Sequence, residues 1–428
     1  MANTDLLLLG PGEFSFGFRA QADLVTAAAT GTSADWTWLD AVAPSLGWNY
    51  ETGAEQKSSG QRGANARKGV GPKTGTLSFR VELPGQAADH DATSDTPVDS
   101  GPWELLMAAI GETANGTYAA AAVEASPAPT ANGFTLASGT VVVGAAYAFG
   151  ASPTAIRGIF FVEALNTLAV TMRCDARAIP VAGDNLYPLL TAAPAPPSST
   201  PVYTFRLVGE LADIDFRYVG AVLSKATITW DAAGSPFCDL EFTVYAGDAR
   251  GDDGGLRTVA DLLQIDEYSG RGNAHLAIGQ TVLTALDDGA ADGGVCGTNG
   301  HSLAFEFPHR RVTCPGAEER VGAVVLRAPM ITVSFTVDFT PDWDDSDGAN
   351  LFVAAWRNQT PVPYQLSVGK HAGQMLAVSL PAALVDAAPG EGPQDGAWGY
   401  QVTLTAGPYT GDGASTGLGN RPAAVAVG

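Results

Sequence analysis

The stretch from Gly75 to Gly85, GTLSFRVELPG, alternates strictly between apolar and polar residues. Its apolar residues are Leu77, Phe79, Val81 and Leu83, and the polar residues between them are Thr76, Ser78, Arg80 and Glu82. A second stretch, ITVSFTVDF, repeats the pattern from Ile331 to Phe339. Because successive side chains of a β-strand point to opposite faces, both stretches predict strands with one face on a core and one in water.

Further strands are predicted over 216–224, 225–232, 239–247 and 399–407. Turn residues lie between the predicted strands, and the 51 glycines and 27 prolines of the chain fit many short strands joined by long loops.

Two short helices are predicted. In the first, over 99–111, Pro102 and Glu104 suit a first helical turn and Gly111 ends the pattern. Its apolar residues share one face at helical spacing, which predicts a helix that covers one face of a sheet: Trp103, Leu106, Met107 and Ile110. The second helix is predicted over 347–356, after an acidic turn.

These elements repeat in order along the chain. Each half has an alternating strand, a short helix, further strands and a similar ending, LEFTVYAGDARGDDG over 240–254 and YQVTLTAGPYTGDG over 400–413. The endings align as Thr-Val-Tyr-Ala-Gly-Asp against Thr-Leu-Thr-Ala-Gly-Pro. The order of elements predicts two copies of one β-rich domain with one helix each.

The predicted first domain is discontinuous, with residues 1–125 and 202–255, and the second covers 256–428. Two Pro-rich segments, 126–133 and 191–201, read as linkers. They delimit a small inserted all-β module over 126–201, which we expect to be exposed.

The charge of the chain argues against a protein that grips nucleic acid, but not against a surface along which DNA slides. The chain of 428 residues has 45 acidic and 23 basic residues, a net charge of −22. Proteins that grip nucleic acid need clustered Lys and Arg to neutralise phosphates. The N-terminal stretch has no basic n-region and no long apolar run, and no window resembles a membrane span, so we expect synthesis in a cytoplasm and no membrane contact.

No catalytic constellation is recognisable, and we expect neither an enzyme nor a cofactor. None of the five histidines lies in a G-x-S-x-G or H-E-x-x-H context, and no P-loop or Rossmann motif occurs. The acidic turn over 341–350 misses the register of an EF-hand loop, so helix capping is the simpler interpretation.

The four cysteines form no CxxC pair, and buried free thiols are the simplest interpretation. Two alternatives stay open for a symmetric C-x4-H-x7-H-x4-C arrangement: a zinc site or a disulfide between its two cysteines. Its members are Cys296, His301, His309 and Cys314.

One loop is basic in an otherwise acidic chain. The segment EQKSSGQRGANARKGVGPKTG, over 55–75, is rich in Gly, Ser and Asn and has almost no large apolar residues. It carries five basic residues: Lys57, Arg62, Arg67, Lys68 and Lys73. A mobile surface loop is one interpretation. The other is an arm that becomes ordered against the acidic surface of a neighbouring copy.

Several of these motifs, taken in order, resemble the tail tube proteins of long-tailed bacteriophages. A basic, glycine-rich loop leads into TGTLSFRVELPG, which is followed by the helix GPWELLMAAIG and by YVGAVLSKATITWDAAGSPFCDLEFTVYAGD. The second half, from MITVSFTVDF to GYQVTLTAG, looks like a second, diverged copy. The resemblance covers about 250 residues, and the order of motifs carries it more than any single one.

The resemblance implies a mainly β fold with two tandem tail-tube-like β-sandwich or barrel domains. Six such domains form a ring in that family, so a homotrimer would complete a pseudo-hexameric ring here, with a homohexamer as the alternative. Stacked rings would form a virion tail tube, assembled in the host cytoplasm, through which double-stranded DNA passes during ejection. The implied partners are the tape measure, terminator and baseplate proteins, and the basic loop would contact the adjacent ring.

Two other functions remain open from the sequence. A baseplate hub or distal tail protein would use the same fold in a single ring. A carbohydrate-binding or glycan-cleaving β-protein is the third hypothesis, because eight Trp and eleven Tyr residues offer stacking platforms for sugars.

Overall fold

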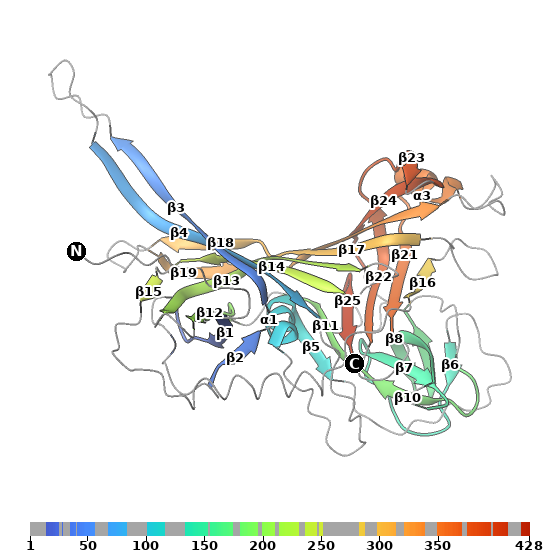
Figure 1. The fold of residues 1–428 in the computed structure, drawn as a ribbon. Coiled ribbons are helices and arrows are strands. Elements are labelled where there is room, and N and C mark those ends of the chain that lie inside the picture. Colours follow the sequence, from blue (N-terminus) through green and yellow to red (C-terminus); the bar gives the residue numbers. More distant parts are fainter. Residues whose placement is uncertain are drawn as a thin grey trace.

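The computed structural model is mainly β, with several sheets, none of them closed, and two helices among the residues it describes (Figure 1). The helices are α1 (Gly101–Ile110) and α3 (Ala349–Asn358). The described residues are 14–24, 28, 35–39, 41–55, 67–83, 101–115, 133–152, 155–173, 180–195, 199–209, 214–230, 236–245, 248–250, 282–286, 298–313, 321–338, 349–369, 375–394, 397–409 and 421–428.

Most strands form two sets within one large sheet system. The first set contains β1 (Phe14–Ala20), β2 (Thr37–Leu39), β3 (Ala41–Glu55), β4 (Arg67–Glu82), β12 (Tyr203–Gly209), β13 (Ile214–Trp230), β14 (Phe237–Val244) and β15 (Asp248–Arg250). The second set contains β16 (Val282–Leu286), β17 (Thr298–Glu306), β20 (Met330–Asp338), β21 (Val362–Val368), β22 (Leu376–Val385), β23 (Gly390–Gln394), β24 (Ala397–Ala406) and β25 (Ala424–Val427).

The remaining strands form smaller units. A two-stranded hairpin consists of β18 (His309–Thr313) and β19 (Val321–Leu326). A separate five-stranded sheet has the order β10-β7-β8-β9-β6, from β6 (Gly133–Thr135), β7 (Ala146–Gly150), β8 (Ile156–Asn166), β9 (Ala169–Met172) and β10 (Asn185–Pro188). The strands before and after this sheet in the sequence, β5 (Gly111–Asn115) and β11 (Leu190–Pro194), belong to the large sheet system. They pair with each other, and β11 also pairs with β25.

The two alternating stretches are strands with the predicted faces. Their apolar side chains are all buried where the structure describes them: Leu77, Phe79, Val81, Leu83, Ile331, Val333, Phe335 and Val337. The intervening polar side chains from Thr76 to Glu82 and from Thr332 to Thr336 are exposed or half-buried. Period-two patterning is therefore a correct guide here, because each strand has one face on the core.

The first predicted helix is also present, and its apolar face is buried. Leu105 and Ala109 are buried too, so α1 is enclosed by the sheet system on more than the predicted face. Gly111 ends the helix with φ of +120°, and a Cβ there would meet the carbonyl oxygen of Ala195 at 2.2 Å, so no larger residue fits.

The prediction of two strands over 216–224 and 225–232 is wrong, because β13 is one continuous strand. Its pairing with β14 shifts register between Leu223 and Lys225, which marks a β-bulge. The sequence has no Gly or Pro at that point, so the chain bends without turning back.

Both sets have the same order of pairing. The order is β1-β12-β13-β14-β4-β3 in the first and β16-β21-β22-β24-β20-β17 in the second, antiparallel throughout. β23 continues the line of β22 along β24, so β22 and β23 together occupy the place of the long strand β13.

Irregularities recur at matching positions. Between β12 and β13 the register jumps from Tyr203↔Ala221 to Phe205↔Tyr218, and between β21 and β22 it jumps equally from Val362↔Ala383 to Tyr364↔Leu380. A bulge also follows Val42 in β3 and Asn299 in β17. Shared defects of this kind fix which residues of the two sets correspond.

The registers correct one detail of the predicted repeat. Thr243 pairs with Thr76, and Thr405, rather than Thr403, pairs with the corresponding Thr332. The two endings are thus offset by two residues from the sequence alignment. A two-residue slip leaves every side chain on its own face, so the alternation gives no warning of it.

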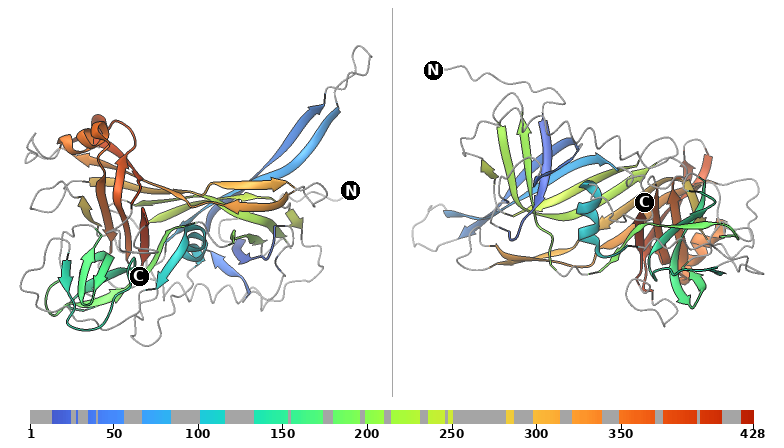
Figure 2. Two further views of the ribbon diagram at one scale, coloured as in Figure 1. Left: turned by 180° about the vertical axis from the view of Figure 1, so that it is seen from behind. Right: turned by 90° about the horizontal axis from the view of Figure 1, so that it is seen from below.

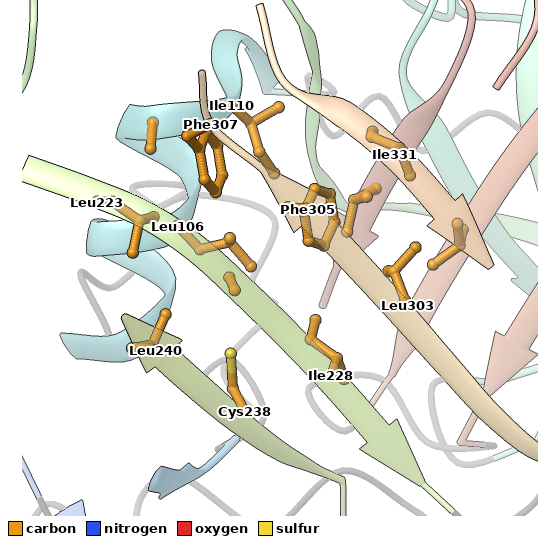
Figure 3. Close-up of a cluster of buried hydrophobic side chains, with 14 of the residues drawn as sticks. Leu106, Ile110, Leu223, Ile228, Cys238, Leu240, Leu303, Phe305, Phe307 and Ile331 are labelled. Atoms are coloured by element: carbon orange, nitrogen blue, oxygen red, sulfur yellow. The ribbon is translucent and has the colours of Figure 1, made fainter. Parts of the chain in front are cut away.

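One hydrophobic cluster extends through both sets. Figure 3 shows side chains of α1, β13, β14, β17 and β20 meeting in it, among them Leu106, Leu223 and Phe305. The cluster therefore joins the two sets through buried apolar contacts, not through the chain connection alone.

The five-stranded sheet packs on the second set. Its Ile159 and Phe161 share a buried cluster with Ala377 of β22 and Ala424 of β25. The Gln365 side chain of β21 donates a hydrogen bond to the Ile159 carbonyl oxygen at 2.8 Å. This sheet, inserted beside first-set strands in the sequence, lies against second-set strands in space (Figure 1).

Candidate assembly surfaces

The two sets are joined edge to edge by a seam between β13 and β17. The strands pair antiparallel from Lys225↔Glu306 to Trp230↔His301. The pairing continues one step further, where the Phe307 N–H donates to the Ser224 carbonyl oxygen at 2.9 Å. Backbone hydrogen bonds therefore join the two sets into one continuous sheet.

The polar face of this continuous sheet runs from β4 through β14, β13, β17 and β20 to β24. It is rich in Ser and Thr, with Thr76, Ser78, Thr227, Thr229, Ser302, Thr332, Ser334 and Thr403 all exposed or half-buried. Arg80 is held by Asp239 in a two-pronged ion pair, at 2.7 Å and 2.8 Å. Lys225 lies in register with two carboxylates, Glu241 and Glu306.

The counterparts of the seam strands each pair on one side only, within the part of the chain that the structure describes. β3 holds the position of β17 and, among the described strands, pairs with β4 alone. β23 holds the position of the second half of β13 and, within the same described strands, pairs with β24 alone. The chain thus offers two complementary edges at its opposite ends.

Prolines occupy outward positions of the β23 edge. The Asp386 N–H donates to the Thr403 carbonyl oxygen, so alternate residues along β24 face β22 and β23. From this register, Gly390 and Gly392 direct their backbone N–H groups toward β24. The backbone hydrogen-bonding groups of Pro389, Glu391 and Pro393 point away from β24, toward the free edge. Proline on an edge removes donors that would template unselective pairing.

The β18–β19 hairpin lies on the first set. The Thr200 hydroxyl donates to the Val324 carbonyl oxygen at 2.7 Å and accepts from the Leu326 N–H at 3.2 Å. The rings of His309 and Tyr245 make an edge-to-face contact with centroids 5.9 Å apart. A second-set hairpin is therefore anchored on first-set residues at both of its strands.

The outer part of β3 and β4 corresponds to that hairpin. Thr52 pairs with Val70 after a register shift, as His309 pairs with Leu326, and Ala54 pairs with Lys68 as Arg311 pairs with Val324. We call this part, residues 48–55 and 67–74, the arm. Figure 1 shows the arm projecting beyond the other strands that the structure describes.

The arm contains part of the predicted basic loop. Arg67, Lys68 and Lys73 lie in β4, whereas Lys57 and Arg62 lie outside the described residues. The expectation of a loop is wrong for 67–75, because these residues pair with β3. Sequence reasoning missed the extended hairpin, since its glycines and lysines have low β-propensity.

The histidines of the symmetric Cys/His arrangement have separate surroundings. His301 is buried in β17, with Nδ1 3.2 Å from the Tyr364 hydroxyl, while Nδ1 of His309 lies 3.2 Å from the Phe307 carbonyl oxygen. Cys296, Cys314 and the acidic turn over 341–348 lie outside the described residues. Within the described part of the chain, no group of three metal-ligating side chains occurs.

Two buried ionisable side chains, Cys238 and Tyr364, are not activated as nucleophiles. Cys238 is a free, buried thiol, and burial raises its pKa well above the ordinary value, which leaves it protonated at neutral pH. Burial likewise raises the pKa of Tyr364, the partner of His301. Neither group has the lowered pKa of an activated nucleophile.

No helix among the described residues is long and apolar enough to cross a bilayer. Neither the protein-family models nor the curated proteins compared with this chain match it.

Proposed function

We propose that the protein is a structural subunit of a bacteriophage tail tube, in which the two sets are two copies of one tube domain. Chains associate head to tail into a closed ring, and rings stack into a channel for DNA. The seam between β13 and β17 is the observation that carries the proposal, since it is a contact between the two sets made inside one chain. Both of its edges recur at the ends of the chain, in β3 and β23, each of which pairs with one neighbour among the described strands.

In this ring, β3 of one copy lies along β23 of the next. By the register of the seam, Leu46 faces Glu391 and the Trp48 N–H meets the Pro389 carbonyl oxygen. Pro44 and Pro393 face each other and end the ladder, so the pairing between copies is shorter than the seam within a chain. A cyclic arrangement of such heterologous contacts closes without leaving a free edge.

The polar face of the continuous sheet suits the wall of a DNA channel. Its hydroxyl groups are neutral, and its basic groups, Arg80 and Lys225, each face carboxylates. A wall of this kind attracts phosphate weakly, so DNA would slide along it without being held. The chain's net charge of −22 acts in the same direction.

Electron microscopy of the purified protein tests the proposal. Ring-shaped particles with six similar wall segments, and tubes at higher concentration, are the expected result. Particles that stay monomeric at all concentrations and salt conditions would refute it. Single rings that never stack would favour a baseplate hub or distal tail ring instead.

A further inference from the structure

We propose that the arm of each copy docks on the second set of the next copy in the same ring, in the place that the β18–β19 hairpin occupies on the first set. The proposal rests on the ring assembly proposed above and names one further contact within it. The family resemblance instead implies contact with an adjacent ring, so the two arrangements give different experimental results.

The receiving surface is defined by the residues that hold β18–β19. Ser224 corresponds to Asp386 and Thr200 to Gln359 by the registers of β13 and β22 and of β12 and β21. Tyr245 corresponds to Gly407, and the backbone repeats the correspondence: Tyr245 N–H bonds the Gly220 carbonyl oxygen as Gly407 N–H bonds that of Ala382.

Two of these positions are covered in the first set and exposed in the second, whereas Gly407, like Tyr245, is buried. Thr200 and Ser224 are half-buried beneath β17 and the β18–β19 hairpin, whereas Gln359 and Asp386 are exposed. The two hairpins differ in the corresponding way: Figure 1 shows β18–β19 lying along the first set, whereas the arm extends past the chain's own strands. Both hairpins extend toward the same side of the chain, although the arm rises more steeply from the sheet than β18–β19 does (Figure 2).

The two contacts differ in their side chains. In the strand that carries the contact, Val324 of the hairpin corresponds to Lys68 of the arm, while in the other strand Arg310 and Arg311 correspond to Gly53 and Ala54. The contact inside a chain uses the Thr200 hydroxyl, which bonds the hairpin backbone. The contact between copies would bring Lys68 of the arm toward the exposed Asp386, and opposite charges of this kind favour orientation and association rate.

Cross-linking with a short bismaleimide tests the placement in a background where the four native cysteines are replaced by alanine. Gly69→Cys with Gln359→Cys probes the proposed contact between copies. The matched reference, Val325→Cys with Thr200→Cys, uses the corresponding positions inside one chain, and Leu46→Cys with Glu391→Cys probes the ring edge itself. Mass spectrometry of the linked peptides identifies each product.

The expected result is a Gly69–Gln359 link between copies, roughly tenfold above the single-cysteine variants, with a covalent trimer as the largest species. A ladder of species larger than a trimer would place the arm on an adjacent ring and overturn the inference. Rings that cross-link at the Leu46–Glu391 edge but not at the arm would overturn the docking of the arm and leave the ring proposal intact. Absence of both links between copies, with the reference link formed, would overturn the ring proposal as well.

Discussion

Removing one aromatic side chain from the seam should destabilise the whole chain. Phe305 lies in β17, is fully buried, and has its ring centroid 6.2 Å from that of Phe307. Figure 3 shows Phe305 among side chains of α1, β13 and β20, so Phe305→Ala opens a cavity where both sets meet. The expected outcome is a loss of global stability, because one cluster serves both sets.

The magnitude follows from burial. Exposing a fully buried Phe side chain loses about 1.5–3 kcal/mol of transfer free energy. The cavity raises the total to about 3–5 kcal/mol, because packed neighbours relax only in part. A matched control is Val325→Ala in β19, whose side chain is 52% exposed and should change the unfolding free energy by less than about 0.5 kcal/mol.

Urea denaturation followed by tryptophan fluorescence and circular dichroism measures both variants. The two probes should report one transition, with a lower midpoint and an unchanged slope for Phe305→Ala. A loss below about 1 kcal/mol would refute the shared core, given the range for buried Phe. Two separate transitions, with only the second-set transition shifted, would refute it equally.

Three further predictions concern assembly and pH. Glu391→Pro should leave the urea midpoint unchanged, because the N–H of Glu391 points away from β24. It should weaken ring formation by roughly threefold to tenfold per contact in analytical ultracentrifugation. Gly390→Pro is the matched control, and it should lower the midpoint because the N–H of Gly390 points toward β24. A variant with glutamine at all five basic positions should keep the fold and lose most of the salt dependence of assembly; the positions are Lys57, Arg62, Arg67, Lys68 and Lys73. Light scattering at low and high salt measures this dependence. Tubes that form unchanged at physiological salt would exclude an electrostatic arm. The unfolding free energy should fall as pH rises above 10. Burial raises the pKa of Tyr364, and it raises the pKa of Tyr245 to about 12, so both side chains stay protonated in the folded chain while the unfolded chain loses protons. Tyr364→Phe should make this fall with pH less steep in urea titrations, and an unchanged pH dependence would contradict the assignment.

The sequence predicts strand faces well where one face is buried. Leu77, Phe79 and Val81 follow the period of two because β4 has the hydrophobic core on one side and water on the other. It predicts the order of elements for the same reason. Pairing partners depend on contacts between distant segments, so the seam between β13 and β17 has no local signal.

The residue composition of two segments conceals their structure from a reading of the sequence. The face of β22 and β25 that receives the five-stranded sheet consists largely of alanines, such as Ala377 and Ala424, which give little amphipathic contrast. The extended arm contains Gly69 and Lys73, residues depleted in strands, and forms because β3 and β4 continue a ladder begun lower down. Tertiary context overrides local preference at both places.

Native mass spectrometry of the assembled protein tests the central claim most directly. The account predicts a closed species of three times the 43.9 kDa chain mass, with larger species in multiples of that trimer as rings stack. A protein that remains at the mass of one chain under all assembly conditions would contradict head-to-tail association. A closed hexamer would contradict the equivalence of the two sets, because six chains would then supply twelve wall segments.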